Sequence, residues 1–271
     1  SYSALACIAI QSNQNDQHGG QAIASFDYDM APGVAKTYIK EYRRALGAAL
    51  ELLLNHDAAN EEAKSIVRQI ENEIGAKPTL KPNKEFDDAL RERLTAMSDE
   101  ATAERIIHYA TERGYRETER RTYQAMEAFI HNLNTMHSRA GAQTPFSSIN
   151  YGMDTSPEAR MVMRNLLLAT ESGLGNGETP IFPIQIFRVK EGVSYNPGDP
   201  NYDLFRLAIR VSAKRLFPNF SFVDAPFNLK YYKPGHHETE IAYMGCRTRV
   251  IGNVYDPTRE VCNRRGNLSF T

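Results

Sequence analysis

The sequence predicts an α/β fold with a helical region inserted between two parts that contain strands. Apolar residues recur at helical spacing through residues 31–137. After residue 138, short β-branched and aromatic runs alternate with helical segments, which predicts βαβ units and a mainly parallel sheet. The 271 residues are 41% apolar and 24% charged, as in globular proteins. We therefore divide the chain into residues 1–30, 31–137 and 138–271.

The N-terminal half is expected to be helical after a short first segment. Residues 1–11 are apolar and precede the polar loop SNQNDQHGGQ, so they form either a buried helix end or a strand. Pro32 stands where the first turn of a helix tolerates proline. Further helices are expected over 58–74 and 85–96. A long amphipathic stretch follows, and we expect Gly114 to divide it into two helices.

The C-terminal half is expected to contain the sheet. Strands are predicted at QTPFSSINYG, TPIFPIQIFRVK, NFSFVDA, ETEIAYMG and GNLSF. Helices are predicted at SPEARMVMRNLLLATESGLG and DPNYDLFRLAIRVSAKRLF. The first of these helices begins with Ser-Pro-Glu and ends at glycine, which are favourable residues at the two helix ends.

Charge and cysteine usage exclude several classes of protein. A net charge of −1 gives no indication of a nucleic-acid or membrane surface, and no apolar run is long enough to span a bilayer. The first residues lack the features of a signal peptide. Three cysteines without CxxC spacing indicate a reducing, cytoplasmic setting. Because the chain starts without methionine and stops within a strand-like run, we expect it to be a segment of a longer protein.

Cys246 is the first candidate for chemistry, although the local pattern leaves its role open. It follows Gly245, which permits a tight turn, and nearby arginines lower the pKa of a thiol. An isolated cysteine is nevertheless most often a small buried apolar residue. The same reading is the simplest for Cys7 in LACIAI, and Cys262 has no pattern that points to a role.

Polar clusters offer two further candidate sites. The stretch SRAGAQTPFSS concentrates hydroxyls, an amide and an arginine at a strand entry, as in an active-site wall or a hydrogen-bonded turn. Lys36 and Lys40 belong to a basic helix face that either meets phosphates or is simply solvated. His236 and His237 have acidic neighbours without metal-ligand spacing, so no metal site is predicted.

Six motifs occur in an order that points to one family. They are QSNQNDQHGGQ, SRAGAQTPFSSINYG, LLATESGLGNGETPIFPIQIF, DPNYDLFRLAIRVSAKRLFPNFSF, YMGCRTRV and RGNLSFT. On these motifs the chain resembles the anaerobic (class III) ribonucleotide reductases, which are glycyl-radical enzymes acting on ribonucleoside triphosphates. The likeness runs from Cys7 to Thr271. It implies part of a ten-stranded α/β barrel with a finger loop, and an inserted helical region.

The resemblance implies roles for particular residues. Cys246 corresponds to the finger-loop cysteine, whose thiyl radical removes the hydrogen at the 3′ carbon of ribose. Cys7 corresponds to a cysteine on the first barrel strand that assists reduction at the 2′ carbon. Asn267 replaces a third cysteine, which implies formate as the reductant. The residues implied to line the ribose site are Ser138, Gln143, Ser147 and Ser148.

The resemblance also implies partners and cofactors. The helical region would form a homodimer and bind dNTP or ATP effectors, with Lys36 and Lys40 facing the triphosphate. No cofactor is expected on this chain. The parent protein would need a glycyl radical made by a radical S-adenosylmethionine activating protein, formate, and zinc in a C-terminal region. The 271 residues show no glycyl-radical motif, zinc-binding cysteines or N-terminal ATP-binding domain, so we expect the isolated chain to be inactive.

Two alternative functions remain open at this point. One is another glycyl-radical enzyme of the formate-lyase type, although that family usually carries two adjacent finger cysteines and here Gly245 precedes Cys246. The other is a module that binds dNTP and dimerises without catalysing a reaction. Binding of dNTP without turnover would distinguish the second alternative.

Overall fold

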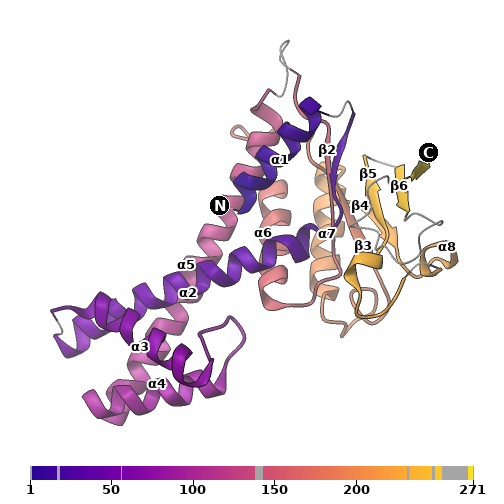
Figure 1. Cartoon of the computed structure of the whole chain (residues 1–271). Coiled ribbons are helices and arrows are strands. Elements are labelled where there is room, and N and C mark those ends of the chain that lie inside the picture. The colour runs from indigo at the N-terminus through magenta and orange to yellow at the C-terminus, as the bar shows by residue number, and fades with distance from the viewer. Residues whose placement is uncertain are drawn as a thin grey trace. The chain divides into compact units, whose positions relative to one another are not determined.

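The chain divides into two compact units, shown in the computed structural model of Figure 1. One unit combines Ser1–Ala31 with Tyr123–Thr271, and the other is Pro32–Thr122. The residues that the structure describes are 2–16, 19–55, 57–137, 143–230, 232–245, 248–251 and 268–270. None of the described helices combines the length and the apolar character needed to cross a membrane.

Helices make up the Pro32–Thr122 unit. Its elements are α3 (Ala59–Ile74), α4 (Lys84–Met97) and most of α2 (Phe26–Leu54) and α5 (Glu100–Thr135). The helices expected over 58–74 and 85–96 are thus confirmed as α3 and α4. Their apolar faces meet in one core, which includes Tyr38, Tyr42, Leu46, Leu50, Ile70, Phe86, Leu90, Leu94 and Ile106.

Two expected helix boundaries in this region were wrong. Helix α2 begins at Phe26, so Pro32 lies inside it and not in its first turn. Helix α5 continues through Gly114 without a break. A Cβ at Gly114 would lie 3.1 Å from Tyr42 Cα, so the glycine permits close approach of two helices. The glycine therefore serves packing between α2 and α5, and its low helix propensity does not end the helix.

The first segment is a helix, so of the two alternatives for residues 1–11 the helix is confirmed, and the expected strand position of Cys7 was wrong. Helix α1 spans Tyr2–Asp16, and the first strand, β1, comes later at Gln21–Ile23. The buried residues of α1 are Ser3, Cys7, Ile10 and Gln14. Their spacing of three or four residues is the helical period, and a strand would have buried every second residue.

A four-stranded parallel sheet forms the centre of the larger unit. Its order is β1-β2-β3-β4, where β2 is Ser147–Tyr151, β3 is Ile184–Val189 and β4 is Asn219–Phe222. Helices α6 (Pro157–Ser172) and α7 (Tyr202–Arg215) connect successive strands and lie beside the sheet in Figure 1. The expected βαβ pattern is therefore confirmed for this part of the chain.

The cap residues of α6 behave as their sequence predicts. Ser156 precedes the helix and accepts a hydrogen bond from the Ala159 amide at 3.2 Å, and Gly173 follows the last turn. Tyr151, Phe187, Phe205 and Phe220 form an aromatic cluster between the sheet and α7. This packing fixes which face of the sheet is covered by helices.

The remaining strands form a second sheet, which is antiparallel. After α8 (Pro226–Leu229) and the 3-10 helix η1 (His237–Thr239), strand β5 (Ala242–Met244) pairs with β6 (Thr248–Ile251). Strand β6 also pairs with β7 (Leu268–Phe270). The expectation of a mainly parallel sheet thus holds only for β1 to β4. Within the described residues these four strands do not close into a barrel.

Candidate functional site

The parallel sheet has one face toward the helices and one polar face away from them. Tyr151 donates a hydrogen bond to Gln185, which in turn donates to Thr170 of α6, so these strand residues point toward the helices. Side chains alternate along a strand. Ser148, Asn150 and Arg188 therefore point to the opposite face, and all three are fully buried there.

Strand β5 lies against this polar face and is held by side chains of β2. Asn150 Oδ1 accepts from the Tyr243 amide at 2.8 Å, and Asn150 Nδ2 donates to the Tyr243 carbonyl at 2.9 Å. Ser148 Oγ accepts from the Gly245 amide at 3.0 Å. We call Ser148 and Asn150, with these three hydrogen bonds, the β2 clamp.

A buried group of charges holds the start of the same segment. Arg188 Nη2 lies 3.3 Å from Asp27 Oδ1, and Arg188 Nη1 lies 3.0 Å from Glu240 Oε2. Tyr28 donates a hydrogen bond to Glu240 Oε1 at 2.8 Å. Asp27 and Arg188 are fully buried and Glu240 is 4% exposed. We call Asp27, Arg188 and Glu240 the ionic triad.

Asp27 also binds the backbone of the loop that follows β2. Its Oδ2 accepts from the backbone amides of Gly152, Met153 and Asp154, each at 3.0 Å. These three hydrogen bonds satisfy one oxygen of the buried carboxyl group. The ionic triad therefore joins the first turn of α2, the loop after β2, the end of β3 and the segment just before β5.

Burial dominates the electrostatics of this cluster. It raises the pKa of the Glu240 carboxyl to about 7, while Arg188 acts in the opposite direction. Burial also raises the pKa of Asp154, and burial together with Glu240 raises the pKa of the Tyr28 hydroxyl. Glu240 is thus the carboxyl of the triad that changes protonation near neutral pH.

Comparison with known proteins identifies the family of the chain. The sequence model of the anaerobic ribonucleoside-triphosphate reductase family matches residues 1–271. The chain belongs to this family. The reductase of that name from Haemophilus influenzae is 33% identical over 151 residues, which cover 55% of this chain and 20% of that protein. The Enterobacteria phage T4 reductase is 34% identical over 152 residues, covering 56% and 24% respectively.

Coverage of the relatives is partial. The aligned segments span 17% to 24% of the length of the curated reductases, which include that of Escherichia coli at 34% identity over 127 residues. The matches therefore establish a family for this part of a reductase chain.

Several residues predicted from the reductase resemblance lie outside the described residues. These are Cys246, Asn267 and Ser138, and also Cys262. The structure does describe Gly245, directly before Cys246, and its amide is held by the β2 clamp. Strand β5, which we call the stem, therefore leads along the chain toward Cys246.

Cys7 does not occupy the strand position that the resemblance implied. It lies on α1 with 2% of its surface exposed, and its Sγ is 4.0 Å from the Phe129 carbonyl. Burial raises the pKa of the thiol to about 11, although the Asn132 side chain lowers it. The expected strand position of Cys7 was therefore wrong. Its role at the ribose 2′ carbon stays a prediction.

The structure describes three of the four predicted ribose-site residues. Gln143 is exposed. Ser147 and Ser148 are adjacent on β2, so their side chains point to opposite faces of the sheet. Ser148 lies on the face that receives β5, and Ser147 lies on the helix face. The two serines therefore face different sides of the sheet, and their place in a ribose site stays a prediction.

Sequence reasoning missed Asn150 and the ionic triad, although two signals were available. Asn150 is an amide inside a strand whose five residues are all buried, and Arg188 is a charge inside another fully buried strand. A buried polar group needs a partner. The partners Tyr243 and Glu240 are far along the chain, and nothing local indicates them.

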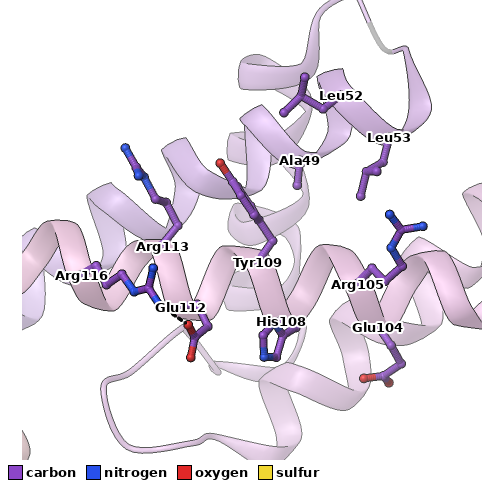
Figure 2. Close-up of a pocket in the computed structure, with 10 residues that line it drawn as sticks. All are labelled: Ala49, Leu52, Leu53, Glu104, Arg105, His108, Tyr109, Glu112, Arg113 and Arg116. Atoms are coloured by element: carbon purple, nitrogen blue, oxygen red, sulfur yellow. Dashed lines mark hydrogen bonds and ion pairs between the residues drawn. The ribbon is translucent and has the colours of Figure 1, made fainter.

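A groove on the helical unit is a separate candidate site. Figure 2 shows this groove between α2 and α5, with a volume of about 740 Å³. Its lining residues are Ala49, Leu52, Leu53, Glu104, Arg105, His108, Tyr109, Glu112, Arg113 and Arg116. Glu112 and Arg116 pair with each other at 3.1 Å. Lys36 and Lys40 are exposed on α2 but are not among the lining residues.

Proposed function

We propose that the full-length protein containing this chain reduces ribonucleoside triphosphates to deoxyribonucleoside triphosphates. The observation that carries the proposal is the family match across all 271 residues. The curated relatives it resembles are named anaerobic ribonucleoside-triphosphate reductases. The polar sheet face with an anchored β5 stem supports a barrel interior, and we propose that further strands complete the ten-stranded barrel.

The proposed chemistry uses the Cys246 thiol. As a thiyl radical, the sulfur would remove the hydrogen from the ribose 3′ carbon and later return it, while the 2′ hydroxyl leaves as water. Formate supplies two electrons and is oxidised to CO₂. The sum is nucleotide plus formate plus a proton giving deoxynucleotide, CO₂ and water. Asn267 is proposed to hydrogen-bond an oxygen of formate or substrate, since an amide both donates and accepts.

The stored radical and the zinc belong to the proposal for the whole protein. A glycyl radical, generated by an activating protein, would supply the oxidising equivalent that forms the thiyl radical. Among the described residues, no three His, Cys, Asp or Glu side chains lie together in a group that would hold a metal ion. We assign no step of the reaction to zinc. Because the chain spans 17% to 24% of the relatives, we expect the isolated chain to form no dNTP.

The direct test is an anaerobic assay of the full-length protein. It is incubated with the activating protein, S-adenosylmethionine, a reductant, a ribonucleoside triphosphate and ¹⁴C-labelled formate. The proposal predicts one labelled CO₂ for each dNTP formed. A protein that binds dNTP and carries a glycyl radical but leaves the nucleotide unreduced would contradict it. An acyl-transfer product in place of dNTP would indicate the formate-lyase-type alternative.

A second proposal assigns nucleotide-effector binding and dimerisation to the helical unit. The supporting observation is the groove of Figure 2, where Arg105, Arg113 and Arg116 stand against two glutamates beside Tyr109. Arginines suit a triphosphate, and Tyr109 offers a face to a base. Lys36 and Lys40 stay the predicted effector residues from sequence.

Stabilisation by a bound dNTP distinguishes the groove from the helix face that carries Lys36 and Lys40. A bound dNTP raises the melting temperature of the full-length protein by mass action. If the groove is the site, Arg105→Gln weakens this rise and Lys36→Gln does not. The opposite pattern would favour the lysines. A monomer in sedimentation, with no rise for any dNTP, would contradict the second proposal in both forms.

A further inference from the structure

Strand β5 is bound on its two edges in different ways. One edge pairs with β6 in register, with Tyr243 opposite Arg249. On the other edge no strand of the described part of the chain pairs with β5, and the Asn150 side-chain amide takes that place. Its oxygen and nitrogen meet the Tyr243 amide and carbonyl at 2.8 and 2.9 Å. A side-chain amide presents one acceptor and two donors, so it reproduces the pairing of a neighbouring peptide.

Asn150 is itself held in place by a third bond. Its Nδ2 also donates to the Ile23 carbonyl of β1 at 3.2 Å, and its side chain is fully buried. The amide orientation is thus set by both β1 and β5. A change of rotamer at Asn150 would leave buried polar groups without partners, which costs about 1–3 kcal/mol each.

Ser148 fixes the stem at its far end. The Gly245 amide donates to Ser148 Oγ at 3.0 Å, and Ser148 is fully buried. Gly245 has a φ of +64°, and a Cβ there would lie 3.2 Å from Phe146. The residue before Cys246 is therefore fixed by a hydrogen bond, a left-handed backbone and an aromatic neighbour.

We propose that Ser148 and Asn150 are positioning residues that set the place of the Cys246 thiol relative to the substrate ribose. The proposal rests on the proposed function of Cys246. It gives Ser148 a role besides the predicted contact with ribose, because Ser148 Oγ accepts a hydrogen bond from the Gly245 amide. Hydrogen abstraction requires close approach, and a misplacement of 1 Å costs about 10²-fold in rate. Neither side chain is required to touch the substrate.

The test uses the full-length enzyme with Ser148→Ala and Asn150→Leu. Each single variant is expected to lower kcat at least tenfold. The double variant is expected to lower kcat by about 10²-fold. The KM for the nucleotide is expected to stay unchanged in all three. Ser148→Thr keeps the hydroxyl and is expected to restore turnover. The control is Ser221→Ala, a buried serine that lies opposite Arg188 in the β3–β4 register, whose hydroxyl makes no hydrogen bond among the described residues. Its kcat is expected to match wild type.

Three measurements separate this proposal from a general loss of structure. Glycyl-radical content and melting temperature are measured for every variant, and both should stay near wild type for Ser148→Ala. A wild-type kcat in Ser148→Ala and Asn150→Leu would overturn the proposal, as would a raised KM at unchanged kcat. If Asn150→Leu does not fold, Ser148→Ala decides alone. Cys246→Ser is run in parallel: turnover by that variant would overturn the proposed function itself.

Discussion

Replacing Arg188 with methionine is predicted to destabilise the chain strongly. Methionine keeps much of the apolar stem, so the main loss is the cation between Asp27 and Glu240. Arg188 is fully buried. Removing one partner of a buried ion pair costs about 3–5 kcal/mol, because the remaining charge stays uncompensated.

The two carboxyls should contribute unequally to that cost. Asp27 keeps three backbone amide donors at 3.0 Å, and these hydrogen bonds offset part of the lost attraction to Arg188. The pKa of Glu240 is already about 7 with Arg188 lowering it, so without Arg188 the group takes up a proton at neutral pH. Protonation limits the loss at Glu240. We therefore expect about 3 kcal/mol at pH 7, the lower end of the range.

Urea unfolding followed by circular dichroism measures this loss. The matched control is Arg210→Met, because Arg210 pairs with Glu171 on the surface with its side chain 60% exposed. That exposed pair is expected to contribute about 0–1 kcal/mol. Equal destabilisation by the two variants, or a loss below 1 kcal/mol for Arg188→Met, would refute the reasoning about the ionic triad.

Three further predictions concern single residues. The pKa of Glu240 is about 7 in the folded state and 4.5 in its usual environment. The stabilisation by protonated Glu240 is therefore complete below pH 4.5 and is lost as the pH rises through 7. Glu240→Gln should therefore remove up to about 3 kcal/mol of pH dependence in unfolding free energy, and an unchanged profile would contradict this. The Cys7 thiol, with its pKa raised to about 11 and 2% exposed, should react with a thiol reagent at pH 8 only after unfolding. Gly114→Ala should destabilise by about 1–3 kcal/mol in urea despite alanine's better helix propensity, because Tyr42 Cα lies 3.1 Å from the new Cβ, and a stabilised variant would count against that packing.

Local patterns predicted the elements whose signals are local. Ser156 and Gly173 bound α6 as expected from their capping preferences, and the β-branched run of Ile184–Val189 forms a strand. The helix over Tyr2–Asp16 was left open because its period requires counting the polar Ser3 and Gln14 as buried. Gly114 was misread because its partner, Tyr42, is on another helix.

Long-range partners explain what sequence reasoning missed at the candidate site. Asn150 and Tyr243 are 93 positions apart, and Asp27 and Arg188 are 161 apart. No local period or spacing records such a pairing. The alternation of side chains along β2 could have shown that Ser147 and Ser148 face different sides. Whether Ser147 or Ser148 points toward β5 depends on which side of the sheet the helices cover.

The most direct measurement of the central claim is dNTP formation by Cys246→Ser in the activated full-length enzyme, beside Cys262→Ser. Serine preserves the shape of the side chain but removes the sulfur that would carry the thiyl radical. We predict that Cys246→Ser keeps its glycyl-radical signal in electron paramagnetic resonance and forms no dNTP, whereas Cys262→Ser reduces nucleotide nearly as well as wild type. Formation of dNTP by Cys246→Ser at a rate close to wild type would contradict the account.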